Sequence, residues 1–224
     1  DNAGYLVLVD GVPRDANNVM PSEIAQISFL KGAQAVVLYG SKAAKGAVVI
    51  TTKRGNVEGL NVSVRANTGV HVAKAYPEYL GSAEYMTLYN EALLNDDPTA
   101  KPLYTAEQIY NHGSGLNPYR YPNINYYSSD YVKKAYNRSE VTAEITGGGK
   151  RARFYSNVSY YRNGDFLDFG EAKNNMTDRF NVRGNVDVDI NSFISAYINA
   201  NATFYNSKSA KGDYWNAAAT VRPK

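Results

Sequence analysis

From residue 60 onward the chain repeatedly alternates apolar with polar residues, and this pattern constrains its fold more than any other feature. The alternation begins in residues 60–72 and returns in residues 141–146, 180–190 and 194–205. In the last of these, the apolar set is Ile194, Ala196, Ile198, Ala200, Ala202 and Phe204. Because successive side chains of a strand point to opposite faces, the pattern predicts β-strands with one apolar face and one polar face.

The alternation alone leaves two β architectures open. A soluble sandwich buries its apolar face, whereas a transmembrane barrel turns that face toward lipid. Three features favour the barrel: strands of about 12 to 15 residues, Arg and Asp on the polar faces, and connections that are long and short in turn. The long links are 73–137 and 164–175, and the short ones are 147–150 and 191–192.

The strands expected between residues 59 and 207 are too few to close a barrel. A plugged barrel of roughly 22 strands would need about 650 residues. An unclosed edge in lipid would leave backbone amides unpaired. We therefore expect the chain to be part of a larger polypeptide.

Residues 1–55 differ in composition from the rest of the chain, being rich in Ala and Val, and predict a small α+β domain. Strands are expected over 5–10, 24–30 and 46–52, with a short helix over 33–39 that ends at Gly40. Residues 56–224 then form the start of the barrel, with a long external loop over 73–137. Within this loop, residues 82–95 predict a helix with Ser82 as its N-cap, and 105–110 predict a shorter helix.

Composition excludes several kinds of chemistry. The chain has no Cys and two His, so thiolate metal sites, Cys nucleophiles and clusters of several His are excluded. A net charge of +3, evenly spread, disfavours nucleic-acid binding. No nucleophile stands at a plausible spacing from a base, so we expect no enzyme activity, no cofactor and no metal. Asp187, Asp189 and Arg183 are interpreted as solvated residues of a hydrated lumen wall rather than as a cation site.

A cluster of aromatic and amide side chains in the long loop is the candidate substrate-binding site. Flat aromatic faces beside directional amide donors and acceptors suit sugars and peptides alike. A loop whose tyrosines only anchor its own fold is an equally good interpretation. The candidate residues are Tyr119, Arg120, Tyr121, Asn123, Asn125, Tyr126 and Tyr127.

Several runs of sequence resemble one known family. The run Leu-Val-Leu-Val-Asp-Gly-Val-Pro at 6–13, with 29–33, 39–46 and 49–55, resembles the plug of the SusC/RagA-like TonB-dependent outer-membrane transporters. The run Arg-Phe-Asn-Val-Arg-Gly-Asn at 179–185 is similar to an early barrel strand of that family. The family commonly has an acidic residue where Asn125 stands, so no carboxylate role is carried over to this position.

The resemblance implies a location in the outer membrane and TonB-dependent import of glycan or peptide fragments. It also implies three further contacts: a SusD-like surface lipoprotein, membrane lipid, and TonB, which would bind an N-terminal segment that this sequence does not contain. In this interpretation Ile198 faces lipid. The alternative is a soluble, secreted, β-rich module that binds glycans or mediates adhesion.

Overall fold

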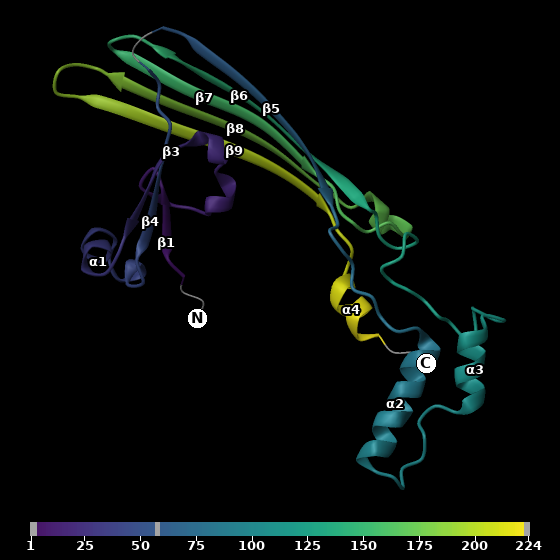
Figure 1. The fold of residues 1–224 in the computed structure, drawn as a ribbon. Helices are drawn as coiled ribbons and strands as arrows, with labels where there is room; N and C mark the ends of the chain where they lie inside the picture. The colour runs from purple at the N-terminus through teal and green to yellow at the C-terminus, as the bar shows by residue number, and fades with distance from the viewer. Residues whose placement is uncertain (1–3, 57–58, 222–224) are drawn as a thin grey trace. The chain divides into compact units, whose positions relative to one another are not determined.

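A computed structural model describes residues 4–56 and 59–221, and two β-sheets dominate it (Figure 1). By internal contacts the chain divides into two compact units. The first comprises residues 1–68, 139–162 and 177–206, and the second comprises residues 69–138, 163–176 and 207–224. Within the part of the chain that the structure describes, no helix has the length and apolar character needed to cross a membrane.

The N-terminal sheet belongs to the first unit and has the strand order β2-β1-β4-β3. Its strands are β1 (Leu6–Val9), β2 (Val12–Pro13), β3 (Ile24–Leu30) and β4 (Ala47–Thr52), and β4 runs parallel to β1 and antiparallel to β3. The helix α1 (Ala33–Tyr39) joins β3 to β4. Three short 3-10 helices complete this region: η1 (Ala16–Asn18), η2 (Pro21–Glu23) and η3 (Ser41–Ala43). The strands and helix predicted for residues 5–52 are confirmed.

Small apolar residues form the core of the N-terminal region. One cluster consists of Leu8, Ala35, Ala43 and Ala47, and a second is centred on Val9 and Ile50. Gly46 precedes β4 with a φ of +113°, and a Cβ placed there would lie 2.9 Å from the carbonyl oxygen of Leu30. Glycine is therefore required where the chain turns into β4.

The second sheet has five strands, each hydrogen-bonded to the next in chain order. They are β5 (Asn61–Val72), β6 (Ala135–Gly148), β7 (Ala152–Asn163), β8 (Met176–Asp189) and β9 (Ser195–Lys208). The strands predicted from the alternation are confirmed, as are the short turns after β6 and β8. β6 and β8 begin earlier than the alternation indicates because their first residues are mostly polar on both faces.

The two faces of this sheet differ in burial as the alternation predicts. On β8 the polar residues Asn181, Arg183 and Asn185 are buried, whereas Phe180 and Val186 on the other face are exposed. On β5 the apolar side chains are also exposed, with Val64 at 67%. On β6, β7 and β8 the polar face is thus the covered one, the reverse of a soluble sandwich, whereas on β5 polar residues such as Arg65 are exposed as well.

The second unit contains the long link between β5 and β6, with α2 (Ser82–Asp96) and α3 (Ala106–Ser114). It also contains η4 (Gly170–Asn174) and α4 (Tyr214–Thr220). The prediction of Ser82 as the N-cap of α2 is wrong, since Gly81 occupies that place. The hydroxyl of Ser82 instead donates to the carbonyl oxygen of Pro122 at 3.0 Å. The domain division between residues 55 and 56 stays a prediction, and residues 57–58 beside it lie outside the described residues.

Candidate functional site

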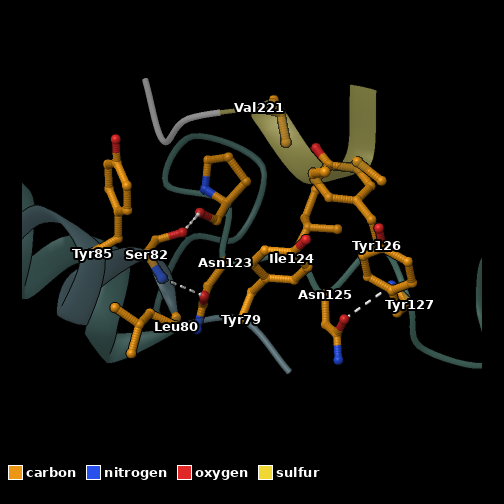
Figure 2. Close-up of a pocket in the computed structure, with 14 residues that line it drawn as sticks. Tyr79, Leu80, Ser82, Tyr85, Asn123, Ile124, Asn125, Tyr126, Tyr127 and Val221 are labelled. Carbon is orange, nitrogen blue, oxygen red and sulfur yellow. Dashed lines mark hydrogen bonds between the residues drawn. The ribbon is translucent and has the colours of Figure 1, made fainter. Parts of the chain in front are cut away.

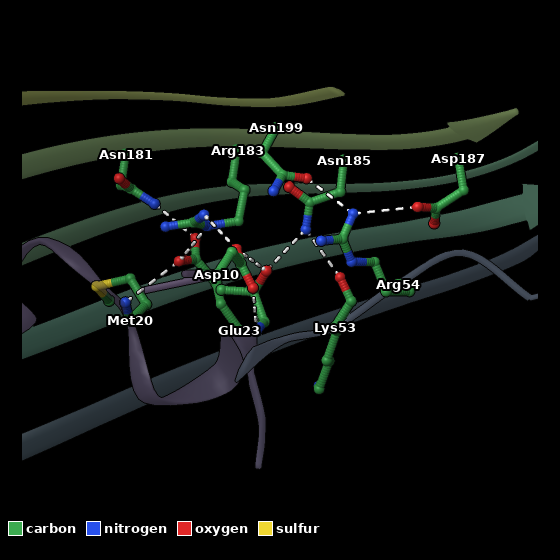
Figure 3. Close-up of polar contacts among 11 residues, drawn as sticks. Asp10, Met20, Glu23, Lys53, Arg54, Asn181, Arg183, Asn185, Asp187 and Asn199 are labelled. Carbon is green, nitrogen blue, oxygen red and sulfur yellow. Dashed lines mark hydrogen bonds and ion pairs between the residues drawn. The ribbon is translucent and has the colours of Figure 1, made fainter. Parts of the chain in front are cut away.

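A buried ion pair joins the N-terminal region to the polar face of the five-stranded sheet, within the first unit (Figure 3). Nε of Arg183 on β8 donates to Oε2 of Glu23 at 2.9 Å, and the two side chains are 1% and 0% exposed. Nδ2 of Asn181 donates to the other oxygen of Glu23 at 2.6 Å. These contacts link residues about 160 positions apart in the sequence.

The short helix η2 sets the position of Glu23. Pro21 occupies its first turn, where the fixed φ of proline suits a helix start. The carboxylate of Glu23 also accepts a hydrogen bond from the backbone N–H of Met20 at 3.3 Å. Local structure thus helps to orient this side chain toward the sheet.

A second acidic residue of the N-terminal region, Asp10, faces the same guanidinium. Its Oδ2 lies 3.8 Å from Nη1 of Arg183. Asp10 also accepts hydrogen bonds from the backbone N–H and the hydroxyl of Thr52, at 2.9 and 2.6 Å. Asn185 then donates to the hydroxyl of Thr52 at 2.9 Å and to the carbonyl oxygen of Lys53 at 2.8 Å.

The chain just after β4 supplies two more ion pairs with the sheet. Nζ of Lys53 lies 3.0 Å from Glu144 on β6. Nη1 of Arg54 lies 3.1 Å from Asp187 and donates to Asn199 at 2.8 Å. The interface is therefore held by charged side chains of the N-terminal region and by charged and amide side chains of the sheet.

The expectation that Arg183 is solvated is wrong. The N-terminal region covers Arg183, which therefore needs a partner of opposite charge once water is excluded, whereas Asp187 stays partly exposed and pairs with Arg54. Asp189 lies 3.2 Å from Arg153. Among residues 4–56 and 59–221, no group of three His, Cys, Asp or Glu side chains could hold a metal ion.

Burial raises the pKa of Glu23 above its ordinary value, although Arg183 and the hydrogen bonds from Met20 and Asn181 oppose the rise. The ion pair and the hydrogen bonds thus make up only part of the hydration that the Glu23 carboxylate loses on burial. Buried polar atoms without a partner among the described residues lie on the same face of the sheet, on Asn157, Ser159 and Asn185. The interface therefore contains little that resembles an apolar core.

A cavity of about 670 Å³ lies in the second unit, between the start of α2, the loop at 122–127 and the end of α4 (Figure 2). Four residues of the predicted site line it: Asn123, Asn125, Tyr126 and Tyr127. None of the described residues that line it is charged. The cavity offers aromatic rings, aliphatic groups and amides.

The other three predicted residues lie outside this lining. Tyr119 is 99% exposed. The guanidinium of Arg120 lies 5.6 Å from the ring centre of Tyr121, and this ring packs edge-on against His112. The structure therefore brings the second half of the predicted cluster together and leaves the first half apart.

Other residues that complete the cavity were not among the predicted site residues. Tyr79, Leu80 and Tyr85 come from the start of α2 and the chain before it. Ala218, Ala219 and Val221 come from α4 and the residue after it, where no helix was predicted. A pair of large apolar residues directly before a predicted helix was the available signal for Tyr79 and Leu80.

Stacked aromatic rings support one wall of the cavity. The rings of Tyr79 and Tyr127 are 5.6 Å apart at 19°, and Tyr127 in turn packs on Trp215 at 6.0 Å. The hydroxyl of Tyr214 donates to the carbonyl oxygen of Tyr126 at 2.5 Å, which ties α4 to the loop. Burial raises the pKa of Tyr127, and that of Tyr214 to about 12, so both hydroxyls stay neutral at physiological pH.

Comparison with known proteins relates the chain to one kind of receptor. It is 24% identical over 221 residues to TonB-dependent receptor P26 of Formosa agariphila, covering 96% of this chain and 20% of that receptor. It is 34% identical over 93 residues to TonB-dependent receptor SusC of Bacteroides thetaiotaomicron, covering 41% of this chain and 9% of SusC. No protein-family model matches.

Solved structures of a peptide transporter share the fold. The RagAB peptide transporter matches with a TM-score of 0.67 at 18% identity, covering 92% of this chain and 25% of that chain. The RagAB peptide importer in its "open-open" state matches with a TM-score of 0.66. This chain spans about a fifth of the length of the first sequence relative. It has the α+β and antiparallel β fold of that part of a SusC-like TonB-dependent transporter.

Proposed function

We propose that this chain, as a stretch of a SusC-like TonB-dependent transporter, serves the import of glycan or peptide fragments across the outer membrane. Residues 1–55 would form part of the plug that closes the barrel. Residues 56–224 would form the first barrel strands, with the external loop at 73–137. Transport is the activity named for the RagAB structures, and the sequence relatives are named receptors.

The buried polar interface is the observation that carries this proposal. The plug meets the wall through Glu23, Arg183 and the pairs made by Lys53 and Arg54, rather than through a continuous apolar core. Polar and charged groups can be rehydrated when two surfaces separate, whereas an apolar core would resist separation. Such an interface suits a plug that holds firmly at rest and yields to a pulling force.

The uncovered apolar face of the sheet supports a place in the membrane. Val62, Val64, Val70 and Val72 on β5 are all exposed, and Ile198 on β9 is exposed as well. A barrel in lipid turns such a band of side chains outward. In water the same band would be a large apolar patch open to aggregation.

The proposed partners follow from the relatives. RagAB is described as a peptide transporter, and SusC as a TonB-dependent receptor. By analogy a SusD-like surface lipoprotein would cover the external side, and TonB would act through a segment that precedes this sequence. The loop cluster from Tyr119 to Tyr127 is the proposed place where substrate is met, with Asn123 and Asn125 as its amide groups.

Uptake by cells tests the proposal. A strain that lacks the gene receives the full-length wild-type protein, and the entry of fluorescently labelled glycan and peptide fragments is followed with TonB present or deleted. We expect uptake that needs both the protein and TonB, and we expect the protein in the detergent-soluble outer-membrane fraction. Uptake that persists without TonB would contradict the proposal. Full-length protein that is monodisperse in water without detergent would favour the secreted binding module instead.

A further inference from the structure

Two short connections of the five-stranded sheet lie at the same end of that sheet, within the first unit (Figure 1). One joins β6 to β7 through residues 149–151, and the other joins β8 to β9 through residues 190–194. The backbone N–H of Asp189, directly before the second connection, donates to the carbonyl oxygen of Arg151 at 2.8 Å, so the two connections lie side by side. We call the surface formed by residues 149–151 and 190–194 the turn rim.

The second connection holds an aromatic side chain outside the fold. Phe193 is 95% exposed. Oδ1 of Asn191 accepts hydrogen bonds from the backbone N–H groups of Phe193 and Ile194, each at 2.8 Å. The backbone N–H of Ile190 donates to the carbonyl oxygen of Ile194 at 2.9 Å, which closes the turn. The exposure of the Phe193 ring therefore follows from a hydrogen-bonded turn of defined geometry.

Phe193 continues the apolar face of the sheet. Ile190 and Ile194 on either side of it are exposed, and both belong to the apolar sets of β8 and β9 in the alternating pattern. These sets form the face that the proposed function turns toward lipid. Apolar surface thus runs without a break from the lipid face onto the turn rim, and this continuity favours lipid over a protein partner.

The first connection adds positive charge to the turn rim. Lys150 and Arg151 are both exposed. Asp189 is the acidic residue beside them, and it is paired with Arg153 at 3.2 Å. Cationic side chains beside an apolar anchor are the chemistry that binds anionic lipid surfaces, because the anchor enters the headgroup region while the cations meet the phosphates. Short turns of outer-membrane barrels lie on the periplasmic side, so the leaflet concerned is the periplasmic one.

We propose that the turn rim binds anionic phospholipid of the periplasmic leaflet, with the ring of Phe193 inserted at the base of the headgroups and with Lys150 and Arg151 on the lipid phosphates. The inference rests on the proposed function, and it deepens that function by naming the lipid class that one end of the barrel binds. The turn rim selects headgroups with a net negative charge over zwitterionic headgroups.

Native mass spectrometry of the detergent-purified full-length protein, titrated with single lipids, tests this inference. The probes are dioleoylphosphatidylglycerol, which is anionic, and dioleoylphosphatidylcholine, which is zwitterionic and has the same acyl chains. We expect the anionic lipid to bind at least about tenfold more tightly, and we expect this preference to shrink as ionic strength rises. Equal affinity for the two lipids would overturn the inference and would leave the turn rim to a protein partner.

A pair of double variants locates the charge selection. Lys150→Gln, Arg151→Gln should weaken binding of the anionic lipid about fivefold for each charge removed and should leave the zwitterionic lipid unaffected. Lys42→Gln, Lys45→Gln is the matched control, because it removes the same charge from exposed residues of the N-terminal region. Wild-type affinity in the first double variant, or an equal loss in both, would overturn the inference.

Substitutions of Phe193 test the apolar anchor. Phe193→Ser should weaken binding of both lipids about fivefold, because the lost contact does not depend on the headgroup. Phe193→Leu keeps an apolar side chain and should bind within about threefold of wild type. Gel mobility that changes on heating, as in wild type, shows that each variant has assembled. Unchanged binding of both lipids by an assembled Phe193→Ser protein would overturn the inference.

The two proposals fail in distinguishable ways. If uptake depends on TonB while Lys150→Gln, Arg151→Gln keeps wild-type affinity for the anionic lipid, the assignment of the turn rim is wrong and the transport proposal stands. If that variant loses the preference for anionic lipid while uptake does not need TonB, the lipid site stands and the transport proposal is wrong.

Discussion

Removing the guanidinium of Arg183 should loosen the plug more than any other single change in the polar interface. In Arg183→Met, the carboxylate of Glu23 remains buried with no cation beside it, and Asp10 loses the same partner. Breaking a buried ion pair by deleting one member costs about 3 to 5 kcal/mol. At about 1.4 kcal/mol for each factor of ten, plug opening becomes roughly 100- to 4,000-fold more frequent.

Hydrogen exchange of backbone amides in full-length protein measures this opening directly. Amides of β3 and β4 should exchange faster in Arg183→Met by that factor. The double variant Glu23→Leu, Arg183→Met should recover part of the lost protection, because apolar residues replace the buried pair at little cost while Asp10 keeps its hydrogen bonds from Thr52 but has no guanidinium beside it. Unchanged exchange in the single variant would refute the reasoning.

A surface pair provides the matched control. Nε of Arg162 lies 3.6 Å from Asp178, and the arginine side chain is half exposed. An exposed pair is worth about 1 kcal/mol or less. Arg162→Met should therefore leave exchange in the N-terminal sheet within about fivefold of wild type.

Three other predictions follow from the same structure. Val64→Arg places a charge on the exposed apolar face and should cost about 2 to 4 kcal/mol of folding free energy if the site lies near mid-bilayer. Asn67→Arg, on the polar face, should cost much less. Equal urea midpoints of the two variants would contradict the assignment of faces. The pKa of Glu23 is raised in the docked state, so plug retention should be strongest below the ordinary pKa of about 4.3 and should weaken as the pH rises through the raised pKa. Hydrogen exchange of the amides of β3 and β4, measured from about pH 4 to 8, checks this. Exchange protection that does not change with pH would contradict the prediction. Gly55→Ala should prevent correct assembly, because a Cβ there would overlap the backbone of β7, and the gel mobility of the protein should then no longer change on heating. The control Gly69→Ala has open space around the new Cβ and should assemble normally. Equal gel mobility of the two variants would contradict the prediction.

Local pattern sufficed for most of the fold. The strict alternation in residues 194–205 identified β9, and a short Ala-rich run ending at Gly40 identified α1. Both elements are specified by residues close together in the sequence: the apolar periodicity of the segment itself and the residue that ends it. α4 was missed because residues 214–220 have little apolar periodicity.

The site was harder to predict because its contacts are distant in sequence. Arg183 could be placed on a polar strand face, but nothing nearby shows that Glu23 would cover it from about 160 residues away. The loop tyrosines were found from composition, which cannot separate Tyr127 in the cavity from Tyr119 in solvent. Tertiary packing alone makes that distinction.

Cryo-electron microscopy of the full-length protein in detergent tests the central claim most directly. We expect the sheet of β1–β4 inside the lumen of a closed barrel that contains β5–β9, with the carboxylate of Glu23 on the guanidinium of Arg183. Density that places this sheet outside a barrel, or shows β5–β9 packed face to face against another sheet, would contradict the account.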